Sequence, residues 1–186
     1  MENFYKIVIG TCERNLKLIK TETGAYYSYN MLGDCTLNQE AAQVLGKLID
    51  HTAFDAIVTV ESKAIALVQE LAVLLRHKKY VVIRKSLKSY MTNVVSVSGS
   101  TIISGSGRYF IDGADVEYLQ GKRILVVDDV ISTCGTIDAV YRLLSKCELK
   151  INAFACVLCE GTITQTFQGI PVISCGFIPL PEINND

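Results

Sequence analysis

Short apolar runs rich in β-branched residues alternate with helical patterns along most of this chain. The runs lie at residues 56–60, 80–83, 124–127, 153–158 and 171–175. Runs of this kind are typical of strands buried on both faces of a parallel sheet. Apolar side chains recur at helical spacing over residues 36–48, 65–75 and 137–147. The alternation predicts an α/β fold: a doubly wound, mainly parallel five-stranded sheet flanked by helices.

Two segments depart from this alternation. Residues 4–33 are predicted to form short strands. Residues 93–111 alternate Val, Ser and Gly, and no acidic residue occurs between positions 91 and 111. This composition predicts a β-ribbon or mobile hairpin rather than part of the core. We therefore expect a single domain over residues 1–186 that carries a small subdomain.

Composition and charge restrict the classes of partner. The 186 residues include 18 Lys plus Arg and 19 Asp plus Glu, so the formal net charge is −1. This balance argues against a nucleic-acid-binding or membrane-surface protein, since both depend on excess positive charge. The sequence has no apolar run long enough for a transmembrane helix, and its first residues lack an export signal. We expect a cytoplasmic protein with no nucleic-acid or membrane partner.

The cysteines indicate a reducing compartment. There are seven, an odd number, and they lack the spacing of a disulfide framework. Cys156 and Cys159 form a Cys-x-x-Cys pattern, but an odd spacing within a strand predicts side chains on opposite faces of the sheet. We therefore interpret both as small buried hydrophobic side chains, and we predict no metal site made by the protein alone.

The most informative segment is residues 124–136, where a buried strand runs into Asp128 and Asp129. A loop with hydroxyl and glycine residues follows, and a helix is expected to begin near Thr136. Ligands of parallel α/β sheets bind beyond the carboxyl ends of the strands, and amides at a helix N-terminus bind anions. The carboxylates cannot bind that anion but suit sugar hydroxyls or waters on a divalent cation. A phosphorylated ribose meets both demands.

This segment resembles the phosphoribosyl-pyrophosphate motif of type I phosphoribosyltransferases. In that motif an apolar strand, an acidic pair, a hydroxyl- and glycine-bearing loop and a helix start follow in the same order. The resemblance covers roughly residues 53–175, and the whole layout looks most like the adenine (purine) branch. It implies that the 5-phosphate is bound by the loop residues Ile131, Ser132, Thr133, Cys134, Gly135 and Thr136. Cys134 stands where the family usually has glycine.

The resemblance also implies where pyrophosphate binds. The segment after the first core strand corresponds to the family's pyrophosphate loop, and the Arg-Lys segment after the second strand carries basic side chains to the same group. The implied pyrophosphate-binding residues are Glu61, Ser62, Lys63, Ala64, Arg84, Lys85 and Lys88. Asp128, Asp129 and Lys85 are implied to be catalytic. The carboxylates would hold ribose hydroxyls and stabilise an oxocarbenium-like sugar, while Lys85 would meet the charge on the leaving group.

By the same resemblance, the remaining segments cover the base. Residues 93–111 correspond to a mobile loop that excludes water from the reaction. Residues 1–33 and 177–186 are expected to form a small hood on a core of about residues 36–175. Tyr26, Tyr27 and Phe177 are the candidates to stack on the base. The adenine branch usually carries a glutamate in the mobile loop, and this chain has none there.

The implied activity is transfer of a 5-phosphoribosyl group from phosphoribosyl pyrophosphate to a purine base, with adenine as the expected acceptor. The products would be pyrophosphate and a nucleoside monophosphate, as in purine salvage. Mg²⁺ is the expected cofactor, bound mainly through the substrate. Phosphoribosyl pyrophosphate, a purine and a second copy of the chain in a homodimer are the expected partners.

Three alternatives stay open at this stage. The same chemistry on hypoxanthine, guanine, xanthine or orotate would change only the base site. A regulatory protein could retain the fold and bind phosphoribosyl pyrophosphate as a signal, although the first fifty residues are neither basic nor typical of a helix-turn-helix. A domain with a degenerate base site that no longer catalyses is the third, and the acid-free loop keeps it open.

Overall fold

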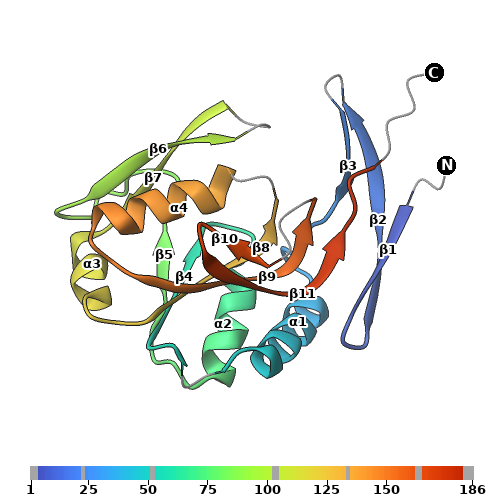
Figure 1. Ribbon diagram of the computed structural model, residues 1–186, viewed down its shortest axis with the longest axis horizontal. Helices are drawn as coiled ribbons and strands as arrows, with labels where there is room; N and C mark the ends of the chain where they lie inside the picture. The colour runs from blue at the N-terminus through green and yellow to red at the C-terminus, as the bar shows by residue number, and fades with distance from the viewer. Residues whose placement is uncertain are drawn as a thin grey trace.

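A mainly parallel β-sheet forms the centre of the molecule (Figure 1). The computed structural model describes residues 4–21, 24–50, 53–101, 105–132, 135–161 and 165–181. The sheet has the strand order β10-β11-β9-β8-β4-β5. Its strands are β4 (Ala56–Val60), β5 (Val81–Ile83), β8 (Ile124–Ile131), β9 (Ile151–Glu160), β10 (Thr166–Phe167) and β11 (Ile170–Ile178). The five strands predicted from the apolar runs are parallel, and the two-residue β10 adds an antiparallel edge.

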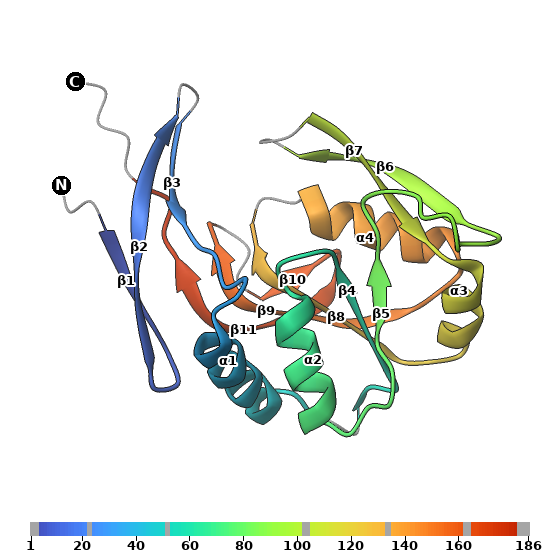
Figure 2. The same cartoon turned by 180° about the vertical axis from the view of Figure 1, so that it is seen from behind.

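Helices cover both faces of this sheet, as the alternation of elements predicts. They are α1 (Cys35–Leu48), α2 (Ile65–Leu74), α3 (Gly113–Leu119) and α4 (Gly135–Lys146). The first two pack on one face, here the α1 face, and the last two on the opposite α4 face (Figure 2). Sequence analysis missed α3, although Asp112 caps it by accepting a hydrogen bond from the Ala114 amide. Within the described ranges, no helix is long and apolar enough to span a bilayer.

Strands β6 (Val95–Thr101) and β7 (Gly105–Ile111) form the ribbon expected from the Val, Ser and Gly alternation. The ribbon is nevertheless not separate from the core, because Tyr109 and Ile111 are fully buried on the α4 face. A Cβ atom at Gly99 would lie 2.4 Å from the Tyr109 ring, so this close packing requires glycine. The Arg142 guanidinium on α4 also donates to the Ser98 carbonyl at 2.9 Å.

A second, three-stranded antiparallel sheet stands at one end of the molecule beside β11 and α1, and we call it the hood (Figures 1 and 2). It consists of β1 (Phe4–Ile9), β2 (Cys12–Thr21) and β3 (Gly24–Ser28). Buried and exposed side chains alternate along β1 and β2, as expected for a sheet with one solvated face. Phe177, expected from sequence to belong to the hood, instead lies within β11 of the central sheet.

The alternation of side chains breaks near the carboxyl end of β9, and this corrects one expectation. Val157 and Leu158 both pack on the α1 face, so the alternation restarts between them, although β9 stays in register with β8 and β11. Cys156 and Cys159 consequently both lie on the α4 face, and their Sγ atoms are 3.6 Å apart. The prediction that these thiols lie on opposite faces is therefore wrong. Both are fully buried, in agreement with their interpretation as small apolar side chains.

Candidate functional site

The carboxyl ends of β4, β5 and β8 bring the predicted site residues together. These strands are neighbours in the sheet, so the segment 61–64, the segment 84–88 and the acidic pair meet at one edge. The peptide bond between Glu61 and Ser62 is cis. The structure thus brings the ribose-binding and pyrophosphate-binding candidates to the edge where parallel α/β sheets bind ligands.

The two carboxylates of the acidic pair point in different directions. Both residues lie within β8 rather than in the loop after it. Asp128 lines a small internal cavity on the α4 face, together with Ile131 and Thr136. Asp129 is 8% exposed, and its Oδ2 atom lies 3.8 Å from the Lys63 ammonium. The pair therefore presents one carboxylate on each side of β8.

The surroundings of Asp128 make its carboxyl costly to ionise. Burial, followed by the neighbouring charge of Asp129, raises the pKa of Asp128 well above its usual range. The Asp129 amide, which donates to Asp128 Oδ1 at 2.9 Å, and the Lys85 charge act in the opposite direction. The Asp129 Oδ2 atom is buried and accepts no hydrogen bond from the described residues. Such a pair has acceptors to offer to hydroxyl groups or to a hydrated cation.

Lys63 connects three parts of the site. Its ammonium lies near Asp129 and donates a hydrogen bond of 3.4 Å to the Tyr29 carbonyl, which follows the last hood strand. Half of the Lys63 side chain is exposed, so it can also reach a ligand. The pyrophosphate-loop candidate, the acidic pair and the hood are therefore in direct contact.

The other basic candidates differ in whether their charged groups already have a partner within the protein. Arg84 forms an ion pair with Glu61, with 3.0 Å between Nε and Oε2. The Lys88 ammonium donates to Ser86 Oγ at 2.7 Å in an exposed turn. Lys85 is exposed, and its ammonium has no ion-pair partner among the described residues. Lys63 and Lys85 are thus the cations with the most freedom to meet an anion.

The phosphate-loop candidates lie where β8 leads into α4. Ile131 is the last residue of β8, and the partly exposed Ser132 follows it. Thr133 and Cys134 lie outside the described residues, so their predicted contacts cannot be compared with the structure. Gly135 and Thr136 form the first turn of α4, whose amides point to the same edge as the acidic pair.

The three aromatic base candidates do not converge. Tyr27 packs against Tyr5 on the inner face of the hood, with 5.2 Å between ring centroids. Tyr26 is the preceding residue on the same strand and therefore lies on the opposite face. Phe177 is 43% exposed and lies at the carboxyl end of β11.

Sequence analysis missed a further carboxylate at this edge, Glu160. It ends β9 in register with Ile178, which is buried on the α1 face, so Glu160 lies on the same side as the hood. Burial raises the pKa of Glu160, and the described residues offer it no ion pair. An acid that follows the apolar run 153–158 with only Cys159 between them was the available signal, since Asp128 likewise follows an apolar run.

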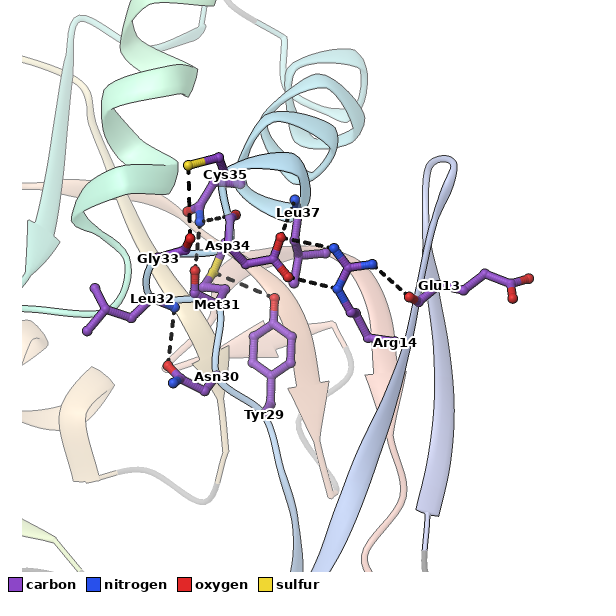
Figure 3. A network of polar contacts seen from close by, with 11 residues as sticks. Glu13, Arg14, Tyr29, Asn30, Met31, Leu32, Gly33, Asp34, Cys35 and Leu37 are labelled. Atoms are coloured by element: carbon purple, nitrogen blue, oxygen red, sulfur yellow. Dashed lines mark hydrogen bonds and ion pairs between the residues drawn. The ribbon is translucent and has the colours of Figure 1, made fainter.

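A network of polar contacts fixes the hood on α1 (Figure 3). Arg14 of β2 binds Asp34 with two hydrogen bonds, Nε to Oδ2 at 2.7 Å and Nη2 to Oδ1 at 2.9 Å. Asp34 also caps α1 by accepting from the Leu37 amide, and hydrogen bonding from Arg14 lowers the pKa of this carboxyl. The buried Asn38 amide donates to the Met31 carbonyl at 2.7 Å. The chain leaving β3 is therefore held near Lys63.

The acidic pair could contribute to binding Mg²⁺ if a substrate supplied further ligands to the ion. Among the residues that the structure describes, no cluster of three His, Cys, Asp or Glu side chains could hold a metal ion. Carboxylate oxygens of Asp128 and Asp129 are nevertheless hard donors of the kind that Mg²⁺ prefers, and Mg²⁺ commonly combines one or two carboxylates with substrate phosphates and water. The residues present fit an ion that the substrate carries.

Comparisons with known proteins agree with this geometry. The phosphoribosyl transferase domain family model matches residues 31–175. The hypoxanthine/guanine phosphoribosyltransferase of Methanotorris igneus is 35% identical over 126 residues, and that of Methanocaldococcus infernus is 32% identical over the same length. Each alignment spans 67% of this chain and 64% of the relative, slightly less than two thirds of the relative's length.

Solved structures of similar fold include adenine phosphoribosyltransferases. The enzyme from Thermoanaerobacter pseudethanolicus has a TM-score of 0.67 at 19% identity, covering 88% of this chain and 95% of that one. The enzyme from Saccharomyces cerevisiae has a TM-score of 0.65 at 17% identity, covering 93% and 94%. Identities this low establish a shared fold only. Because the family match covers residues 31–175, well over half of the chain, the chain belongs to the phosphoribosyl transferase domain family.

Proposed function

We propose that this chain transfers the 5-phosphoribosyl group of phosphoribosyl pyrophosphate to a 6-oxopurine, hypoxanthine or guanine. The observation that carries the proposal is the acidic pair in β8, placed beside the basic segments that follow β4 and β5. The acceptor differs from the adenine expected from sequence. Two relatives that share about a third of their aligned residues are hypoxanthine/guanine enzymes, whereas the adenine enzymes resemble this chain in fold only.

Asp128 and Asp129 would hold the ribose. Sugar hydroxyls would donate to the carboxylates and so lower the cost of keeping two neighbouring acids ionised. Positive charge develops on the sugar as its bond to pyrophosphate breaks, and the two negative charges stabilise that charge. A purine nitrogen then bonds to the anomeric carbon, and the electron pair of the broken bond leaves with pyrophosphate. The purine ring gives up the proton of its imidazole N–H, which a pyrophosphate oxygen can accept. Positioning and electrostatics would carry the reaction without a covalent enzyme intermediate.

The two phosphate ends would be held at separate places. Amides in the first turn of α4 suit the 5-phosphate, with the hydroxyl groups of Ser132 and Thr136 as further donors. The ammonium groups of Lys63 and Lys85 suit the departing pyrophosphate. Mg²⁺ bound with the substrate would neutralise part of the phosphate charge.

The hood and the β6–β7 ribbon would cover the base and exclude water. The division into core, hood and mobile loop, the roles of single residues, the homodimer and a cytoplasmic location stay predictions. Signal binding without catalysis stays the alternative, since residues 91–111 carry no acid.

A competition assay tests the proposal. Purified protein, Mg²⁺ and phosphoribosyl pyrophosphate are incubated with equal amounts of hypoxanthine, guanine, xanthine, adenine and orotate, and the nucleotides are identified by mass spectrometry. We expect inosine and guanosine monophosphates. Adenosine monophosphate as the main product would restore the original expectation for the base. Binding of the donor without any product would favour a signal-binding protein.

A further inference from the structure

Glu61 occupies a central place among the pyrophosphate candidates, yet its carboxylate is already engaged. It lies between the ends of β4 and β5, where it pairs with the Arg84 guanidinium and accepts a hydrogen bond from the Lys85 amide. The side chains of Glu61 and Arg84 are 17% and 28% exposed. By contrast, the surface pair Lys6–Glu13 is 56% and 61% exposed. The Glu61–Arg84 pair is thus comparatively enclosed.

The backbone of Arg84 is fixed as well. Its amide donates to the Phe110 carbonyl at 2.9 Å, and the Phe110 amide donates back to the Arg84 carbonyl at 2.8 Å. Because Phe110 belongs to β7, Arg84 joins the end of β5 to the ribbon. Glu61 therefore links the segment after β4, the segment after β5 and the base of the β6–β7 ribbon.

This arrangement separates the roles of the two neighbouring cations. The charge of Arg84 is balanced by Glu61 through the contact between Nε and Oε2, so the guanidinium brings little net positive charge to a phosphate. Lys85 has its backbone fixed by Glu61 and its ammonium unpaired among the described residues. Its charge acts on Asp128 in the neighbouring part of the site.

We propose that Glu61 is a positioning residue that, together with Arg84, fixes the Lys85 backbone, so that Lys85 rather than Arg84 meets the pyrophosphate. The inference rests on the proposed phosphoribosyl transfer and divides the pyrophosphate candidates into ligands and supports. Glu61 and Arg84 become supports, and Lys85 becomes the ligand. An unpaired carboxylate at position 61 would repel pyrophosphate. Arg84 is therefore needed to neutralise the charge of Glu61.

Rescue experiments distinguish the two roles. The variants are Lys85→Met, Arg84→Met, Glu61→Gln and the double variants E61Q/R84M and E61Q/K85M. Glutamine keeps an acceptor for the Lys85 amide but removes the charge. Readouts are kcat, KM for phosphoribosyl pyrophosphate, and calorimetric binding of pyrophosphate alone. Asp55→Asn, which removes an ion pair at the opposite edge of the sheet, is the matched control.

Loss of Lys85 should weaken pyrophosphate binding by about tenfold to a hundredfold, the usual effect of losing one hydrogen bond to a charged group. The added Glu61→Gln change should not restore it. Arg84→Met should also weaken binding, but E61Q/R84M should return it to within about threefold of the wild type, since no unpaired charge remains. A purely structural defect would lower the Tm without this rescue pattern.

An Arg84→Met loss that equals the Lys85→Met loss and resists rescue would make Arg84 the ligand and overturn the inference. If Arg84→Met does not fold, Arg84→Lys serves in its place, and pyrophosphate binding close to that of the wild type is expected because a cation still balances Glu61. A wild-type protein that neither forms nucleotide nor binds pyrophosphate would instead overturn the proposed function. The two failures are therefore distinguishable.

Discussion

Charged side chains lie at both ends of the parallel strands, which we call the amino edge and the carboxyl edge, but they are paired differently at the two. At the amino edge, Arg123 binds Asp55 with its guanidinium and its amide, at 2.9 Å for each hydrogen bond. At the carboxyl edge, Asp128, Lys85 and Glu160 have no ion-pair partner among the described residues. Hydrogen bonding from Arg123 lowers the pKa of Asp55, whereas burial raises the pKa of Asp128.

We interpret this difference as separating charges that stabilise the fold from charges that are candidates to bind a ligand. Charges that satisfy one another need no ligand and hold elements together. Charges that stay unpaired in a partly buried place cost stability, and proteins commonly retain them where a ligand supplies the missing partner. The same distinction applies within the carboxyl edge itself, where Glu61 and Arg84 are paired and Lys85 is not.

The largest effect is expected from removing the buried carboxylate of the acidic pair that lies near the Lys63 ammonium. Asp129→Asn should lower kcat by about 10²–10³-fold, the range found when one preorganised electrostatic contact to a transition state is lost. The measurement is the initial rate of nucleotide formation at saturating substrate, with circular dichroism to confirm folding. A rate near that of the wild type would remove Asp129 from the catalytic machinery.

A smaller effect is expected at Glu160, the unpaired carboxylate on the hood side. An ionised carboxylate can accept two N–H groups from the edge of guanine, and an amide can accept only one while presenting a donor to the other. Glu160→Gln should therefore lower kcat/KM for guanine by about tenfold and leave KM for phosphoribosyl pyrophosphate unchanged. Equal losses for every base would show instead a general structural effect.

The ion pair between Arg14 and Asp34 tests whether a paired charge near the site has a structural role, as we infer for the pair between Arg123 and Asp55. Arg14→Leu removes both hydrogen bonds to Asp34 and loosens the hood on α1 (Figure 3). We expect KM for the purine to rise by about threefold, with kcat and KM for phosphoribosyl pyrophosphate unchanged, because a partly exposed ion pair contributes only modestly. Loss of phosphoribosyl pyrophosphate binding in this variant would mean that the hood also organises the sugar site.

The smallest expected effect concerns stability, which a substitution at Asp128 should raise, whereas the substitutions above lower activity. Burial raises the pKa of Asp128, so the folded protein retains a proton that the unfolded chain releases, and stability falls as pH rises through that interval. Asp128→Asn should raise the Tm by about 2–4 °C at pH 8, which corresponds to roughly 1 kcal/mol in a domain of this size. Calorimetry from pH 4 to pH 8 should show this gain shrinking toward low pH, where the wild-type carboxyl is neutral. A gain independent of pH would contradict the electrostatic cause.

The sequence was sufficient for the features that depend on local pattern. Apolar runs located the parallel strands, and the strand leading into Asp128 and Asp129 located the side of the sheet where the predicted site residues meet, because parallel strands place their carboxyl ends at one edge. Pairings between distant residues were out of reach. Arg14 with Asp34 and Glu61 with Arg84 depend on how separate elements pack, and no spacing rule predicts them.

The sequence did not predict which face of a strand some side chains occupy, or that part of the ribbon is buried. The break in alternation after Cys156 changes which side chains share a face, and period-two reasoning cannot detect it. Tyr26 and Tyr27 were grouped because they are adjacent in sequence, although adjacent strand residues point to opposite faces. Tyr109 and Ile111 were assigned to a mobile ribbon because serine and glycine surround them, yet both are buried.

The most direct test compares matched carboxylates at the two edges in one assay. Initial rates of inosine monophosphate formation are measured for the wild type, Asp129→Asn and Asp55→Asn under identical conditions. We predict activity in the wild type, a loss of about 10²-fold or more in Asp129→Asn, and a rate within about twofold of the wild type in Asp55→Asn. Equal losses in both variants, or no nucleotide from the wild type with any purine, would contradict the assignment of phosphoribosyl transfer to the carboxyl edge.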